Sequence, residues 1–230
     1  MAIIQIIHFD AVPSLDAPTP RTTVDDTLQK AIRALQGVET PQHFVLGTRI
    51  QDKGAVQITA EWDGVQDYSN FKTSPELTSF IRSFRNLYGE PQPIFHVPLN
   101  QPAFGLSGPA TANVVEYVQV YFPTSLITPS FQRQIEEDFV RFDEIFEKGS
   151  RGDVGLAFGW VLEEQEHEKI EGEKAKCFFI TRGWESMDCF EESVKHDAYK
   201  EAIPLLLAWN APFKMWHVER KVLDGSEVVA

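Results

Sequence analysis

A histidine and a tyrosine, His196 and Tyr199, are three residues apart in the segment RGWESMDCFEESVKHDAY (182–199). Residues at this spacing lie on one side of a helix, and an imidazole exchanges a proton near neutral pH. The pair suits enolisation or carbonyl-directed cyclisation, with His196 as general base or acid and Tyr199 as a hydrogen-bond donor to the substrate carbonyl. The alternative is an ordinary surface helix start.

An arginine and a tryptophan end the apolar run CFFITRGW (177–184). Because side chains alternate along a strand, Arg182 shares a face with Phe178 and Trp184. On a pocket wall, Arg182 could hold a carboxylate or stabilise developing negative charge on an enolate. Phe178, Trp184 and the earlier Trp160 are then candidate substrate-binding residues. The alternatives are an arginine that extends to solvent and aromatic rings that only pack.

Aromatic and histidine positions recur at a nearly constant offset along the chain. Trp62 and Trp184 are 122 positions apart (184 − 62), as are Tyr68 and Phe190 (190 − 68). His96 and His217 are 121 apart (217 − 96). Such matches indicate an internal repeat. Because both halves keep the last pair, a structural hydrogen bond explains His96 and His217 better than catalysis does.

Each half shows the same order of expected elements, β-α-β-β-α-β. In the first half these are strands at 3–9, 43–50, 55–62 and 93–97, with helices over 23–35 and 65–87. In the second half they are strands at 114–122, 155–163, 177–184 and 213–218, with helices over 131–148 and 187–209.

A segment rich in Pro, Gly and small residues, PLNQPAFGLSGPATA, separates the halves. The predicted organisation is a first ferredoxin-like half at 1–97, a linker at 98–112 and a second ferredoxin-like half at 113–230. The third strand of the second half is apolar on both faces, so both faces need burial. We therefore expect an α+β fold in which the two sheets pack together within one chain.

This pattern resembles the dimeric α+β barrel superfamily, which includes antibiotic-biosynthesis monooxygenases, stress-responsive barrel proteins and a polyketide cyclase. The resemblance is carried by Gly47 and Gly159 in the second strands, by the tryptophan that ends each third strand, and by the helix that follows. The chain looks like a fused tandem of the fungal type. The family has two histidines in the turn where the first half has Ser74 and Leu77 and the second half has His196 and Tyr199.

The resemblance implies a ligand cavity between a sheet and its own helices, with any catalysis in the second half. It implies a cofactor-independent enzyme of secondary-metabolism type, a cyclase, isomerase or monooxygenase, acting on a small apolar carbonyl-bearing metabolite. His8, Tyr68 and His96 form an alternative site. A non-catalytic ligand-binding or stress-responsive protein is the rival class. A haem enzyme with His217 as axial ligand is a lesser alternative.

Composition sets further limits on partners. With 34 acidic against 21 basic residues the formal charge is -13, which disfavours nucleic acid and anionic membranes. We expect no membrane span and no signal peptide, hence a cytoplasmic protein. Phosphate-loop, nucleotide and metal-ligand spacings are absent, so neither a cofactor nor a metal is expected. The expected partner is a small-molecule substrate, and a homodimer is left open.

Overall fold

The structure is a computed structural model that describes residues 3–9, 43–52, 55–64 and 92–223, with single positions at 66, 69, 75, 78 and 82. The helix expected over 23–35 lies outside the described residues. The helix expected over 65–87 is described only at those five single positions, and all five are helical.

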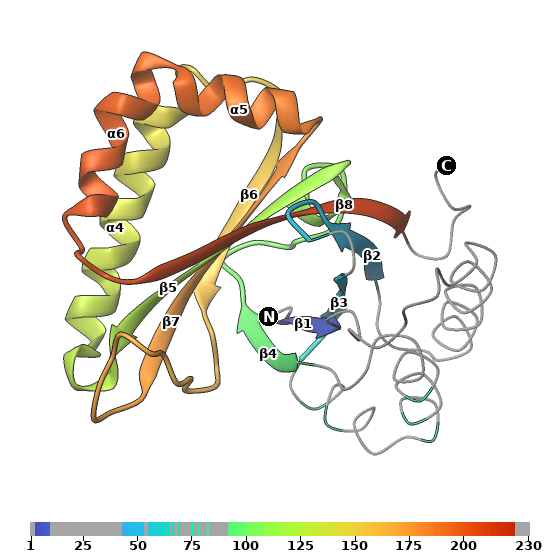
Figure 1. The fold of residues 1–230 in the computed structure, drawn as a ribbon, viewed down its shortest axis with the longest axis horizontal. Coiled ribbons are helices and arrows are strands. Elements are labelled where there is room, and N and C mark those ends of the chain that lie inside the picture. The colour runs from blue at the N-terminus through green and yellow to red at the C-terminus, as the bar shows by residue number, and fades with distance from the viewer. Residues whose placement is uncertain are drawn as a thin grey trace.

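One antiparallel sheet runs through the described residues, with strand order β4-β1-β3-β2-β8-β5-β7-β6 (Figure 1). In each half the last strand lies beside the first, and the third lies between the first and the second. The strands are β1 (Ile3–Phe9), β2 (His43–Arg49), β3 (Val56–Trp62), β4 (Gln92–Pro98), β5 (Val114–Pro123), β6 (Asp153–Trp160), β7 (Ala175–Trp184) and β8 (Phe213–Leu223).

The sheet curls until its two outer strands meet, which nearly closes a barrel. β2 pairs with β8 on one side, and a bridge between Leu99 and Gly159 joins the ends of β4 and β6 on the other. Backbone N–H of Asn100 donates to Phe158 O at 2.9 Å across this second seam. The predicted α+β barrel with its two sheets packed in one chain is therefore confirmed.

Strand register places residues of the two halves at matching positions. Ile3 pairs with Trp62, and Val114 pairs with Trp184. Two positions along, Gln5 pairs with both Ala60 and His96. The corresponding Glu116 pairs with both Arg182 and His217. The partners on the third and fourth strands keep the offset of about 122 residues, whereas the first strands are offset by 111 (114 − 3).

Three described helices cover the outer face of β5 to β8 (Figure 1): α4 (Pro129–Phe146), α5 (Met187–Lys195) and α6 (Asp197–Leu207). Thr128 caps α4 by accepting from the backbone N–H of Phe131, and Pro129 occupies the first turn, where its missing N–H costs nothing. The buried stripe of α4 consists of Ile135, Phe139, Phe142 and Phe146.

The single helix expected over 187–209 is wrong, because the chain forms two helices there. His196 adopts an extended conformation, φ −68° and ψ 152°, between α5 and α6. Its ring Nδ1 accepts from the backbone N–H of Ala198 at 3.1 Å. The chain leaves the helical conformation at His196, and the His196 side chain satisfies a backbone N–H at the start of α6.

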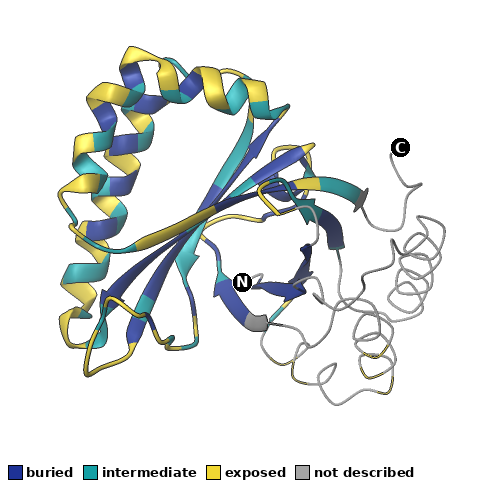
Figure 2. Cartoon of the chain, in the orientation of Figure 1, coloured by how far each residue is buried: buried dark blue, intermediate teal, exposed yellow. Residues whose placement is uncertain are grey.

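Two separate cores result, and β5 and β7, the central strands between them, are buried along most of their length, whereas β6 and β8 are largely intermediate or exposed (Figure 2). The barrel interior combines residues of both halves, including Ile6, Phe95, Tyr117, Phe179 and Trp216. Its polar groups are bonded in a chain, in which Trp216 Nε1 donates to Gln57 Oε1 at 2.7 Å and Thr59 Oγ1 lies 2.9 Å from Tyr117 Oη. The second core is the layer between β5–β8 and the helices, which we call the helix–sheet layer.

Candidate functional site

A row of polar side chains crosses the helix face of the second-half sheet. Glu116 on β5 is paired with Arg182 on β7 and with His217 on β8. Side chains of paired residues on antiparallel strands lie about 5 Å apart on the same face. The matching row of the first half is Ala60, Gln5 and His96, so only the second half holds the charged pair.

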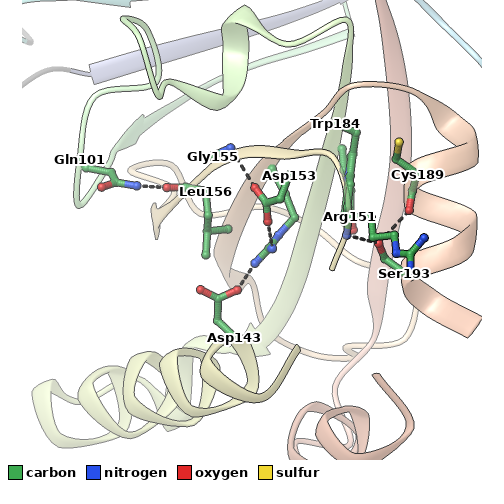
Figure 3. Close-up of polar contacts among 11 residues, drawn as sticks. Gln101, Asp143, Arg151, Asp153, Gly155, Leu156, Trp184, Cys189 and Ser193 are labelled. Atoms are coloured by element: carbon green, nitrogen blue, oxygen red, sulfur yellow. Dashed lines mark hydrogen bonds and ion pairs between the residues drawn. The ribbon is translucent and has the colours of Figure 1, made fainter. Parts of the chain in front are cut away.

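Arg182 is 4% exposed and is held by carboxylates on two sides (Figure 3). One guanidinium nitrogen bonds Asp143 of α4 and another bonds Asp153 of β6. The guanidinium carbon lies 5.0 Å from the centre of the Phe146 ring and 5.8 Å from that of Trp184. The predicted position of Arg182 on the helix face is correct, and its charge is already neutralised by protein groups.

Glu116 is partly buried beside this ion pair. The indole Nε1 of Trp184 donates to Glu116 Oε2 at 2.9 Å. Burial raises the pKa of Glu116, and the Trp184 hydrogen bond and the Arg182 charge oppose this only in part. Burial also raises the pKa of Asp143. Because it is buried, Glu116 keeps a proton to higher pH than an exposed glutamate does.

His217 is 1% exposed and is bonded to a residue of the other half. Its backbone N–H donates to Gln51 Oε1 at 3.0 Å, and its ring Nδ1 lies 2.8 Å from Gln51 Nε2. The Phe190 ring of α5 covers it at a centroid distance of 4.3 Å. Ring Nε2 is buried and has no hydrogen-bond partner within the part of the chain that the structure describes, and burial lowers the pKa of His217 to about 4.

These bonds determine which nitrogen of His217 carries the hydrogen. The backbone N–H can only donate, so the Gln51 atom that faces it is the amide oxygen. The amide nitrogen of Gln51 must then donate to Nδ1, which accepts. In the neutral ring the hydrogen therefore resides on Nε2.

His96 makes the corresponding contact in the first half, but the direction of the hydrogen bond at its ring Nδ1 is reversed. Its backbone N–H donates to Glu163 Oε2 at 3.0 Å, and its Nδ1 bonds the other carboxylate oxygen. A carboxylate accepts, so Nδ1 of His96 carries a hydrogen. Both histidines thus fasten the last strand of one half to the loop after the second strand of the other half, as a structural role requires.

The predicted catalytic residues do not all converge. Tyr199 is half-buried and packs edge-on against Phe146, at 5.9 Å between ring centres, so it shares this ring with Arg182. Burial and the charge of Glu116 raise the pKa of Tyr199. His196 is exposed, uses Nδ1 to cap α6, and packs against Gly149. The structure therefore brings Arg182 and Tyr199 to one cluster with Glu116 and leaves His196 at the surface.

The three predicted substrate-binding aromatics all lie in the helix–sheet layer. Phe178 and Trp184 are fully buried, and Trp160 packs at a tilt against Phe178 with 5.2 Å between ring centres. Trp160 Nε1 donates to Glu136 Oε1 at 2.8 Å. Further aromatic rings fill the space around them, among them Phe122, Phe139, Phe142, Phe158 and Trp209.

The alternative site is not assembled as predicted. His8 faces the barrel interior, where its ring meets Trp216 edge-on at 5.2 Å and its Nδ1 contacts Arg49. His96 pairs with Gln5, on the opposite face of the sheet from His8. Tyr68 lies outside the described residues.

An open groove runs along the outside of the layer, between α4 and the edge strand β6. It has a volume of about 590 Å³. Phe158 lines it and also packs on Phe139 and Phe178, so the groove adjoins the aromatic layer. The other lining residues are Asn100, Arg133, Glu136, Glu137, Val140, Arg141 and Glu144.

Glu116 and Gln51 were not singled out from the sequence. A signal existed for Glu116, because it is the one charged residue within VVEYVQVYF (114–122) and alternation places it on the helix face. Gln51 carries no such signal, since its partner His217 is 166 residues away in sequence.

Within the part of the chain that the structure describes, no three His, Cys, Asp or Glu side chains are arranged to bind a metal ion. The described helices also lack the combination of length and hydropathy that membrane crossing requires.

The residues around His217 do not fit a haem. An axial histidine binds iron through an unprotonated nitrogen and donates its other N–H to an acceptor. In His217 the nitrogen facing the layer carries the hydrogen and Nδ1 accepts from Gln51. Phe190 and Trp184 occupy the adjacent space, with 5.7 Å between their centres.

Solved structures share this fold at low sequence identity. A candidate monooxygenase from Fusobacterium nucleatum superposes with a TM-score of 0.63 and 11% identity, over 99% of this chain and 96% of that chain. An anthrone oxidase-like protein gives 0.58 and 11%, over 100% and 96%. A candidate chlorite dismutase gives 0.58 and 10%, over 97% and 96%. No family model matches the chain, and no curated protein matches its sequence.

The strand order, the nearly closed sheet and these neighbours define the class: the chain has the fold of the dimeric α+β barrel superfamily. The predicted resemblance is confirmed at the level of the fold.

Proposed function

We propose that this protein is a cofactor-independent enzyme that moves a proton on a small, largely apolar, carbonyl-bearing metabolite. The reaction is a cyclisation, an isomerisation or a cofactor-free oxygenation. The observation that carries the proposal is a carboxyl group with a raised pKa, Glu116, placed among aromatic side chains beside Arg182 and Tyr199. A carboxylate whose pKa is shifted toward neutrality is an effective general base.

Each residue has a distinct role in this proposal. Glu116 removes the acidic C–H proton of the substrate. Arg182, fixed by Asp143 and Asp153, limits the cost of ionising Glu116 inside the layer. Tyr199 donates a hydrogen bond to the substrate, since its raised pKa keeps the phenol protonated. His196 acts here through the cap that it provides for α6 rather than through proton transfer.

The groove beside Phe158 supports an aromatic substrate. Its volume of about 590 Å³ suits a molecule of two or three rings. Arg133, Arg141 and three glutamates on its rim give the exposed end charged groups of both signs, which suit a polar substituent.

Anthrone is a suitable first substrate, because a neighbour of the same fold is named anthrone oxidase-like. Loss of the ring C–H proton opposite its carbonyl gives an anthranolate, which is electron-rich enough to react with O₂. The balanced reaction is anthrone + O₂ → anthraquinone + H₂O. The oxygen molecule is the oxidant and no bound cofactor takes part.

The test compares anthrone oxidation by the wild type, Glu116→Gln and Gln5→Ala, followed as oxygen uptake and anthraquinone absorbance. The Glu116 variant should lose about 10²-fold or more, the usual contribution of a general base. Gln5 occupies the matching place in the first half and should be dispensable. Equal rates in all three proteins would refute the assignment of Glu116.

A ligand-binding protein without catalysis is the second candidate. It is favoured by the dense filling of the layer by aromatic rings and by the neutralisation of Arg182 by two aspartates. Its signature would be saturable binding of anthraquinone with no turnover of anthrone, either in air or under nitrogen.

A further inference from the structure

His217 presents a buried hydrogen-bond donor to the helix–sheet layer. Its Nε2 carries the hydrogen, because Gln51 donates to Nδ1, and this Nε2–H has no acceptor among the described residues. Leaving a buried donor unsatisfied costs about 1–3 kcal/mol, so such a group in a native fold calls for an explanation.

The position of this donor is as informative as its lack of a partner. His217 is paired with Glu116, so a ligand atom in contact with the carboxyl group can also reach the imidazole. The ring is neutral at physiological pH, since burial lowers the pKa of His217 to about 4. A neutral imidazole N–H can donate a hydrogen bond to an enolate oxygen without transferring its proton to that oxygen.

We propose that His217 is the oxyanion-stabilising residue of the site: its Nε2–H donates to the substrate carbonyl oxygen while Glu116 takes the C–H proton. This inference rests on the proposed function, to which it adds a residue, His217, and the direction of its hydrogen bond to the substrate. In the step, the substrate C–H bond breaks and its proton bonds to a Glu116 oxygen. The electron pair forms the enolate, whose oxygen accepts from Nε2–H of His217.

The Phe190 ring covers this N–H donor. It lies against both His217 and Trp184, and Phe190 belongs to the short helix α5. α5 is anchored at both ends. At its start Ser186 accepts from Cys189 N. At its end Ser193 donates to Cys189 O and accepts from Arg151 N (Figure 3). The proposed contact requires the Phe190 side chain to rotate aside for the substrate.

The first half supplies an internal control. His96 fastens its strand in the same way as His217, but its Nδ1 carries the hydrogen and its strand neighbour is Gln5. A purely structural role for both histidines predicts similar consequences when either is changed. A catalytic role predicts that only His217 affects turnover.

The first measurement is anthrone oxidation by His217→Leu and His96→Leu. The His217 variant should lose 10²- to 10³-fold in kcat, as expected when one oxyanion donor is removed. The His96 variant, if folded, should keep a rate near that of the wild type. Equal losses, or none, overturn the role of His217, and the Glu116→Gln result still judges the proposed function separately.

The second measurement needs neither turnover nor a folded variant. Ring ¹⁵N spectra of histidine-labelled wild-type protein should show hydrogen on Nε2 of His217 and on Nδ1 of His96. Anthraquinone-2-sulfonate, a soluble carbonyl probe, should shift the His217 Nε2–H signal alone. Hydrogen on Nδ1 of His217, or no response of Nε2–H at saturating probe, overturns the inference.

Discussion

Replacing Arg182 by Met should destabilise the protein strongly. The change keeps an unbranched side chain and removes the positive charge that bonds Asp143 and Asp153. Arg182 is 4% exposed, so water cannot replace the lost contacts. Breaking a buried pair by removing one partner costs about 3–5 kcal/mol. For a chain of this size that corresponds to a fall in Tm on the order of 10 °C.

The loss should depend on pH in a defined direction. Without the guanidinium, the carboxyl groups of Asp143 and Glu116 bind protons more readily in the folded state, because burial then acts without the opposing charge of Arg182. Protonation at pH 5 removes part of the repulsion, so Arg182→Met should be closer to wild type at pH 5 than at pH 8. Urea unfolding followed by far-ultraviolet circular dichroism at both values measures the difference.

Two further variants complete the experiment. Arg151→Met changes an exposed arginine nearby and should stay within about 0.5 kcal/mol of wild type. Arg182→Met combined with Asp143→Asn and Asp153→Asn should recover part of the stability, because the unpaired charges are gone. A loss below about 1 kcal/mol for Arg182→Met, or the same loss at both pH values, refutes the view that this cluster is a buried ion pair.

Three other outcomes follow. Gly159→Ala should cost about 1–3 kcal/mol, because the added Cβ would lie 2.1 Å from Pro98 O, whereas Gly64→Ala meets no atom within 4 Å and should be neutral; urea midpoints compare them. The pKa of His217 is lowered to about 4 in the folded protein, so the stability that depends on its neutral form is present above about pH 6.5 and is lost toward pH 4. In urea titrations over this pH range, the free energy of unfolding of His217→Gln should fall by about 3 kcal/mol less than that of the wild type. His196→Ala should lower the unfolding free energy by about 1 kcal/mol through the lost cap and leave anthrone turnover unchanged, which a fall of 10²-fold would contradict.

Local signals in the sequence were sufficient for most of the sheet and for α4. Alternation along 177–184 placed Arg182 and Trp184 on the helix face, because a strand buried on both sides leaves no freedom of register. Thr128 and Pro129 marked the start of α4. The division between α5 and α6 was missed, since the capping bond of His196 uses a side chain that is more often seen inside helices.

The chemistry of the site was less predictable, because its decisive partners are distant in sequence. Asp143 and Asp153 reach Arg182 from α4 and β6, and no spacing in the sequence reveals that two aspartates neutralise it. The hydrogen on Nε2 of His217 depends on Gln51, which comes from the other half. Such contacts follow from tertiary register rather than from local pattern.

The two histidine fastenings have a consequence for how the halves depend on each other. Gln51 holds His217 and Glu163 holds His96, so each half satisfies a backbone N–H in the last strand of the other. In a pair of identical chains related by a twofold axis, both fastenings would have to be the same. A single polypeptide removes that constraint, and here an amide serves one seam and a carboxylate the other. As the pH falls, His217 takes up a proton on Nδ1 and can no longer accept from Gln51 at the β8 seam. Glu163 at the β4 seam keeps its charge to lower pH, because the desolvation of its carboxyl group is outweighed by hydrogen bonds from His96 that lower its pKa. The barrel therefore has a preferred side on which acid opens it, the β8 side.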